Sequence, residues 1–412
     1  MAESLPQELM DAIIDEVHST SDLKACLLAC HTFSSPTRAI LFRQIKLTES
    51  QLDADAVQRF HELCVVSPHI PLLVQTLYIN GYRCGPTFLA VFDIISCVLQ
   101  YMQSLKVIEF YCVTIGNWTT GMVSSHLFCE IHLTDVIFHE NGFRQMCAVI
   151  RGSPDLERLF VYHNHPPVFG GNATSQLSLD NTHCRACIQD LSIVSRHSYS
   201  FIEAILDTKT CPMSIEELRW FQFTLTRATD FQHLAKILQL TSCSLQVLLL
   251  TFKCASPRQR PLLFPELPII GIGHLRNIAL MVTDHGLQYL QWWIQSLMRV
   301  TQSNQLPTLQ FLDIELGTSY CWNPVASPEW SELDQILLSP LFDKSFRMLM
   351  IKVRKRRAYK ISQEETRLRP SLWGQRARCR ESAEDIVEDM VSQLEVQFPW
   401  LTGKLRFSVK EY

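Results

Sequence analysis

Three histidines and two cysteines form the group in this sequence whose spacing suggests metal chemistry. His163 and His165 are followed, eighteen residues after His165, by His183, Cys184 and Cys187. Imidazole nitrogens and cysteine thiolates are the ligands of tetrahedral zinc. A strong zinc pattern has two well-spaced pairs, whereas here a long loop containing Pro and Gly separates the two halves. We therefore interpret the segment as a surface loop beside a buried strand, and we expect no metal ligands and no cofactor.

The sequence lacks the short motifs that accompany common catalytic sites. It has no Gly-rich phosphate loop followed by Lys, and Gly271-Ile272-Gly273 lacks a third Gly at the required offset. His61-Glu62 and His139-Glu140 are not followed by a His three residues later, as the zincin helix requires. A nucleophile elbow and a kinase motif set are also absent. We expect a protein that is not an enzyme; the alternative is an enzyme whose site is assembled only in space.

The composition is that of a globular protein without a general attraction to anionic partners. Of the 412 residues, 47% are hydrophobic and 19% are charged, and the net charge is −4. This length suits two or three domains of about 150 residues each, or one elongated repeat structure. No segment reaches the roughly 20 apolar residues that cross a bilayer. We expect neither a membrane nor a nucleic acid among the partners.

The cysteines and the N-terminus indicate the compartment. Fifteen cysteines, an odd number without regular spacing, are typical of reduced and mostly buried thiols. The first eight residues are acidic and polar, where a secretory signal would need a positive region and an apolar run. We therefore expect a cytoplasmic or nuclear protein.

The first fifty residues predict three short helices. Ser4 and Gln7 enclose Leu5-Pro6 in the manner of a helix start. Ser21-Asp22 are expected to cap a second helix, and Ser35-Pro36 to begin a third. The first helix would carry one apolar stripe, formed by Leu9, Ile13, Ile14 and Val17.

The second of these helices contains LKACLLAC, residues 23–30, in which seven of eight residues are apolar. A helix that is apolar all round must be covered on every side, and a unit this small cannot cover itself. We expect a shared cover, in which some residues pack on the chain and others meet a partner. The expected inward residues are Ala25, Leu28 and Ala29, and Leu27 and Cys30 are expected to face the partner.

These residues resemble the F-box, in particular the version common in fungal F-box proteins. The shared features are Leu5-Pro6, Glu8-Leu9, Ile13-Ile14, a central L-K-A-C-x-L-x-C and a closing L-F-R-x-I-x-L. The family often has Trp three positions after the second Cys, where this chain has the aromatic Phe33.

The resemblance implies that the segment docks onto the small Skp adaptor of the Skp–cullin–F-box ubiquitin ligase, and through it onto cullin. The rest of the chain would then capture a protein substrate, whose identity the sequence does not contain. Docking would insert apolar helix anchors into a groove. The alternatives are a helical subdomain packed on its own chain and a repeat scaffold without ligase function. The docking residues carried over from the family are Leu5, Pro6, Leu9, Ile13, Leu27, Cys30 and Phe33.

An apolar-x-x-apolar-x-apolar pattern recurs ten times, with successive copies 23 to 37 residues apart. Candidate helices lie between several copies, at residues 88–102, 201–208, 231–240 and 287–300. Strand and helix alternating at about 30 residues is the leucine-rich-repeat pattern, which stacks into a curved solenoid. The copies begin at Val74, Leu105, Phe128, Leu156, Ile188, Leu218, Leu245, Leu275, Leu309 and Phe346.

The predicted fold class is therefore α/β, with an N-terminal three-helix F-box followed by an irregular leucine-rich-repeat solenoid of alternating strands and helices. The copies lack the Asn that usually follows the last Leu, so we expect no asparagine ladder. The competing interpretation is an ordinary α/β domain whose buried strands share the pattern. Because alternate residues of a strand face opposite sides, aromatic candidates for partner contact are Tyr78, Tyr111, Tyr162 and Trp220.

The C-terminal part changes in character. A basic run at 352–360 is followed by further arginines and by an acidic amphipathic segment at 381–397 that predicts a cap helix. The basic run is interpreted as a charge-compensated loop, with a nuclear-localisation signal or an anionic-partner patch as the alternatives. Residues 405–409 predict a final edge strand. The predicted domains are the F-box 1–48, a linker helix 49–69, the solenoid 70–355 and the C-terminal part 356–412.

Overall fold

The structure is a computed structural model in which the chain divides into two units. The first unit contains residues 1–188 and 207–214, and the second contains residues 189–206 and 215–412. The structure describes residues 6–47, 54–81, 97–115, 127–138, 142–162, 186–194, 199–206, 213–252, 271–272, 274–282, 287–302, 307–317, 329–355, 396, 398 and 404–411.

The first unit begins with the three predicted helices, α1 (Gln7–Asp15), α2 (Thr20–Ala29) and α3 (His31–Arg43). Their starts differ from the sequence-based expectation. Ser19 caps α2, because its Oγ accepts the Asp22 N–H at 3.4 Å, and α3 begins five residues upstream of Pro36. Both α1 and α2 pack on α3, and such tertiary packing extends a helix past an unfavourable proline. The predicted Ser4 cap lies outside the described residues.

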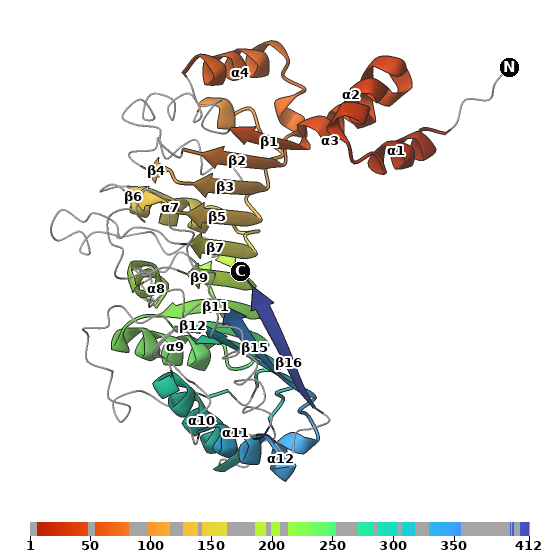
Figure 1. The fold of residues 1–412 in the computed structure, drawn as a ribbon. Helices are drawn as coiled ribbons and strands as arrows, with labels where there is room; N and C mark the ends of the chain where they lie inside the picture. Colours follow the sequence, from red (N-terminus) through yellow and green to blue (C-terminus); the bar gives the residue numbers. More distant parts are fainter. Residues whose placement is uncertain are drawn as a thin grey trace, which may run out of the picture. The chain divides into compact units, whose positions relative to one another are not determined.

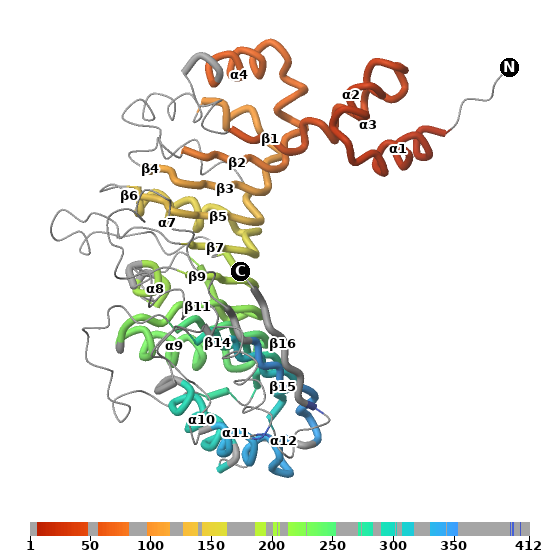
Figure 2. Tube along the Cα trace, in the orientation of Figure 1, coloured from red at the N-terminus to blue at the C-terminus, as the bar shows by residue number. Residues whose placement is uncertain are grey.

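A parallel sheet follows, with its strands in the order of the chain (Figure 1). Figure 2 traces this unit from the red helices α1–α3 through α4 to the yellow α7. The helix α4 lies within the predicted linker helix at 49–69. Of the helix predicted at 88–102, residues 97–102 are described, and residues 97–99 are helical. The elements are β1 (Gln44–Leu47), α4 (Ala54–Val66), η2 (Pro71–Leu73), β2 (Thr76–Asn80), β3 (Val107–Tyr111), β5 (Glu130–Thr134), α7 (Gly142–Arg151) and β7 (Arg158–Tyr162).

Two short strand pairs accompany this sheet in the first unit. Strand β4 (Thr114–Ile115) pairs in parallel with β6 (Ile137–Phe138), and β8 (Ala186–Cys187) pairs in parallel with β10 (Met213–Ser214). Strands β4 and β6 occupy equivalent positions: β4 begins three residues after the end of β3, and β6 begins three residues after the end of β5.

In the second unit the strands are again parallel and in chain order, with helices between several of them. The candidate helices at 201–208, 231–240 and 287–300 are confirmed as α8, α9 and α10. The elements are β9 (Asp190–Val194), α8 (Tyr199–Leu206), β11 (Trp220–Leu225), α9 (Ala228–Leu240), β12 (Val247–Phe252), β13 (Asn277–Val282), α10 (Leu287–Gln302), β14 (Phe311–Gly317), α11 (Glu329–Leu337), α12 (Pro340–Asp343), β15 (Met348–Lys355) and β16 (Leu405–Glu411).

The repeated apolar pattern corresponds to long strands of both units. Each of the ten copies becomes a strand that begins two residues after the first apolar residue of the copy. The predicted strand at 405–409 is confirmed as β16, at the end of the strand order beside β15. The α/β class and the N-terminal helices are thus confirmed, whereas these sheets by themselves do not show a solenoid.

The strand register separates a buried face from an open face in the first sheet. Alternate residues of β2, β3, β5 and β7 are buried, and the residues between them are half-buried or exposed. This alternation is expected of strands with one face against a core. One buried row consists of Leu77, Ile108, Ile131 and Leu159, and the next consists of Ile79, Phe110, Leu133 and Val161.

The same turn follows three consecutive strands of this sheet. Gly81, Cys112 and Asp135 come directly after β2, β3 and β5, and each donates its N–H to the carbonyl of the last residue of the next strand, at 2.8 to 2.9 Å. Cys112 and Asp135 both have a φ of 52°, in the left-handed region that non-glycine residues rarely adopt. The backbone therefore repeats a strained turn at equivalent positions.

The C-terminal predictions fall largely outside the described residues. Lys352 to Lys355 lie in β15, and the rest of the basic run, residues 356–360, lies outside. Of the predicted cap helix at 381–397, Val396 is described and is helical, with an exposed side chain. Phe398 is buried and its ring packs edge-on against Trp330 of α11, with centroids 5.8 Å apart. This contact places Phe398, from the C-terminal part of the chain, in the core of the second unit.

Candidate functional site

Helix α1 presents an apolar row to solvent. Leu9 and Ile13 lie one turn apart, and their side chains are 51% and 49% exposed. Pro6, at the N-terminal cap of the helix, is also exposed and falls on the same side by helical spacing. Ile14 is buried, so the helix uses its other side to pack on α3. The family resemblance named Pro6, Leu9 and Ile13, and all three are accessible.

Helix α2 turns the opposite way from the sequence-based expectation. Leu28 is 87% exposed, and Ala25 and Ala29 are exposed as well, so the prediction that these three residues face the chain's own helices is wrong. The inward face consists of the buried Leu23 and the half-buried Cys26, Leu27 and Cys30. These four positions follow helical spacing, but the uniform apolarity of the segment hides that spacing from the sequence.

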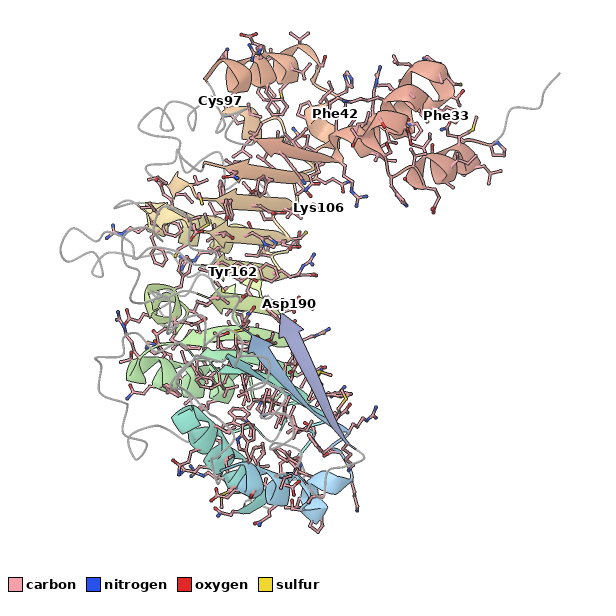
Figure 3. All side chains as sticks on the ribbon, viewed as in Figure 1. Phe33, Phe42, Cys97, Lys106, Tyr162 and Asp190 are labelled. Carbon is pink, nitrogen blue, oxygen red and sulfur yellow. The ribbon has the colours of Figure 1, made fainter. Side chains whose placement is uncertain are left out.

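The start of α3 contributes the last two docking residues. Cys30 caps α3, and Phe33 is half-buried one turn later, with its N–H donated to the Cys30 carbonyl at 3.1 Å. The Cys30 thiol also contacts the Thr32 Oγ1 at 3.4 Å. Hydrogen bonds from the Thr32 side chain and backbone hold the pKa of Cys30 below its usual value. Figure 3 shows Phe33 within the helical segment.

The docking residues predicted from the sequence thus fall into an exposed group and a half-buried group. Pro6, Leu9 and Ile13 are exposed on α1, whereas Leu27, Cys30 and Phe33 are half-buried between α2 and α3. Leu5 lies outside the described residues. Leu28 was not among the predicted residues, although it is the most exposed large apolar side chain of these helices.

Further apolar side chains are exposed on α4 and η2. They are Leu63, Val65 and Val66 at the end of α4, and Leu72 in η2. The element η2 contacts α3, so this part of the unit adjoins the three helices. No pattern in the sequence pointed to these residues, because an apolar residue near a helix end is ordinarily part of the core.

The open face of the first sheet carries polar and aromatic side chains. Glu130 accepts from two partners, with its Oε1 2.5 Å from His132 Nε2 and its Oε2 2.6 Å from Arg158. The His132 ring stacks on Phe160 at 4.4 Å between centroids, and Phe160 stacks on Tyr162 at 6.3 Å. Strands β5 and β7 are therefore joined on this face by an ion-pair network and a ring stack.

The predicted aromatic residues occupy the open faces of their strands. Tyr78, Tyr111 and Tyr162 alternate with buried residues in β2, β3 and β7, and Trp220 does so in β11 of the second unit. Figure 3 shows Tyr162 at the end of β7 and Lys106 immediately before β3. Burial raises the pKa of Tyr78, the charges of Tyr111 and Glu109 add to the increase, and a hydrogen bond with Asn80 opposes it.

The described residues contain no metal-binding group and no spanning helix. Within them, no cluster of three His, Cys, Asp or Glu side chains could hold a metal ion. Of the residues considered for zinc, Cys187 is described, and it is an exposed residue of β8. Among the described helices, none has the length and apolarity required to cross a bilayer.

No protein-family model matches the chain, and no curated protein sequence is significantly similar to it.

Proposed function

We propose that this protein is the substrate-receptor subunit of a Skp–cullin–F-box ubiquitin ligase. Residues 1–48 bind the Skp adaptor, and the repeat region of the remaining chain binds a protein substrate. The observation that carries the proposal is the exposed apolar row Pro6, Leu9 and Ile13 on a small three-helix unit, at positions that match the docking residues of the F-box. Soluble helices rarely expose such a row unless a partner covers it.

The exposed side chains suffice for a helix-in-groove interface. Fully burying one Leu or Ile contributes about 1.5 to 3 kcal/mol. Leu9, Ile13 and Leu28 are 51%, 49% and 87% exposed, so an adaptor groove that covers them would gain a substantial part of that amount from each. A few such anchors dominate the energy of a typical interface. Leu27, Cys30 and Phe33 then support the surface from within.

The same proposal assigns an irregular leucine-rich-repeat solenoid to the rest of the chain. It is supported by the parallel strands in chain order within each unit and by the repeated apolar pattern that begins each strand. The equivalent turns at Gly81, Cys112 and Asp135 are a second repeated feature. A repeat surface of this kind serves to hold a protein target.

In this function the protein supplies proximity and no bond chemistry. The receptor holds its target near the conjugating enzyme, which raises the effective concentration of the target's lysine nucleophiles. The proposed location is the cytoplasm, the nucleus or both, where ubiquitin ligases of this class act.

Co-purification with the Skp adaptor tests the proposal. The wild-type chain is expected to retain the adaptor, and Leu9→Asp combined with Ile13→Asp is expected to lose it, because two charges cannot enter an apolar groove. The control is Val66→Asp, which places the same charge on an exposed apolar residue of α4. Circular dichroism verifies that each variant is folded.

Two results would overturn the assignment. One is a wild-type chain that retains no adaptor, and the other is a folded double variant that binds as well as the wild type. A chain that binds adaptor without recruiting cullin or accelerating turnover of a bound target would be a scaffold outside the ligase.

A further inference from the structure

Two tyrosines, an asparagine and a glutamate form a block on the open face of the first sheet. In the register of β2 and β3, Tyr78 lies opposite Glu109 and Asn80 lies opposite Tyr111. Neighbouring strands are about 4.8 Å apart, so the four side chains are mutual neighbours. Tyr78, Asn80 and Glu109 are half-buried, and Tyr111 is 36% exposed. We call this group the Glu109 site.

The Glu109 carboxylate has no cation of its own in the part of the chain that the structure describes. His132, its neighbour on β5, and Arg158 on β7 both bind Glu130 instead. Lys46 lies beyond Tyr78 on β1 and forms no ion pair there. Lys106 precedes Glu109 by three residues, which is about 10 Å along a strand.

The two glutamates of this face therefore differ in what they can bind. Glu130 is neutralised within the chain by Arg158 and by His132 when that ring is protonated. Glu109 keeps its charge available beside Tyr78, which lies opposite on β2, and beside Tyr111, which lies two residues further along β3 on the same face. Tyr78 and Glu109 are direct partners in the register, and Tyr111 is the next residue on the same face of β3, so the three groups are close enough to act on one ligand.

A carboxylate flanked by aromatic rings is the usual arrangement for binding an organic cation. The carboxylate supplies the opposite charge, and a ring face attracts a Lys ammonium or Arg guanidinium through its quadrupole. The partial burial of Glu109 strengthens each of these interactions relative to a fully exposed carboxylate.

We propose that the Glu109 site binds a Lys or Arg side chain of a protein segment that lies on the open face of the first sheet. The inference rests on the proposed substrate-receptor function and gives it a substrate class, namely targets that present a basic residue in an exposed segment.

A displayed library of random peptides, selected on the purified full-length protein, tests this inference. Peptides that bind the wild type are expected to be enriched in Lys or Arg at one position. Replacing that residue by the neutral citrulline or norleucine is expected to weaken binding about tenfold. Glu109→Gln is expected to weaken the parent peptide by a similar factor and to make it insensitive to the neutral replacement. Tyr111→Ala is expected to weaken it several-fold.

The matched control is Glu130→Gln, which makes the same charge change on the same face but leaves Glu109 intact. It is expected to preserve the preference for a basic residue. The inference is wrong if no peptide is retained, if the retained peptides lack a basic preference, or if Glu109→Gln and Glu130→Gln reduce binding equally. Adaptor co-purification is scored separately on the same protein. Adaptor binding without a preference for basic peptides rejects this inference alone. A preference for basic peptides without adaptor binding rejects the receptor function alone.

Discussion

Gly142, at the start of α7, lies where a side chain has no room. A Cβ at this position would come within 2.2 Å of the backbone carbonyl oxygen of Ile115 in β4. A backbone atom of a paired strand cannot move aside as the end of a flexible side chain does. Gly142 therefore permits α7 to approach β4 closely.

We predict that Gly142→Ala lowers the free energy of unfolding by about 1 to 3 kcal/mol, because the new methyl group overpacks this contact. Thermal unfolding of the purified protein measures the effect. Gly271→Ala is the matched control, since a Cβ there meets nothing within 4 Å. Equal midpoints for the two variants would show that α7 does not approach β4 as closely as the structure describes.

His274 predicts a pH dependence of stability. Its Nε2 is shielded from solvent and has no hydrogen-bond partner among the described residues, and burial lowers its pKa below the ordinary value of 6.5. The unfolded chain therefore takes up a proton at higher pH than the folded chain. Stability is full above the unfolded pKa and decreases as the pH falls below it, towards the folded pKa.

The thermal unfolding midpoint of the wild type is accordingly expected to decrease as the pH is lowered from about 7 to about 5. His274→Gln is expected to make that dependence shallower, because the glutamine side chain carries no titrating group. The exposed His69 is the control, and His69→Gln is expected to leave the slope as it is. An unchanged slope in His274→Gln would contradict the prediction.

At the level of elements, the orientation of α2 divides its leucines into two kinds. Leu23 is 4% exposed and Leu28 is 87% exposed. We predict that Leu23→Lys costs about 3 kcal/mol or more, because it places a charge in the helical core, whereas Leu28→Lys changes stability by about 0.5 kcal/mol or less. Helical circular dichroism during thermal unfolding measures both. Similar losses in the two variants would mean that α2 is turned differently.

The long strands could be predicted from the sequence, and the face of α2 could not. In each copy of the pattern, the last two apolar residues are separated by one residue. That alternation fits an extended strand with one buried face. In α2, by contrast, Leu27 and Leu28 are the same residue type on opposite sides, so hydropathy does not distinguish them. The start of α3 was mispredicted for a related reason, since packing on α1 and α2 overrode the proline signal.

The candidate site shows the same limit. The family resemblance names Leu9 and Ile13, and both are exposed because Ile14 is the residue that α1 buries. Glu109 carried no signal, because its significance depends on the register that places it beside Tyr78 and assigns the nearby cations to Glu130. Pairings across strands distant in sequence are not contained in local spacing.

At the scale of the whole molecule, the two proposed binding surfaces both belong to the first unit but differ in chemistry. The row on α1 is apolar, and docking would remove it from water, whereas the Glu109 site holds a charge at the surface of a sheet. Salt screens exposed charges over a Debye length of about 8 Å at physiological ionic strength and about 3 Å at 1 M. Apolar burial is not weakened by added sodium chloride in this way.

We therefore predict that raising sodium chloride from about 0.1 to about 1 M separates the two activities on one chain. Adaptor co-purification is expected to persist, while the affinity for a selected basic peptide falls several-fold. Glu109→Gln is expected to bind that peptide weakly at both concentrations, because the charge that salt would screen is already absent. Adaptor binding that disappears at high salt would mean that charged residues, and not the apolar row Pro6, Leu9 and Ile13, carry the docking energy.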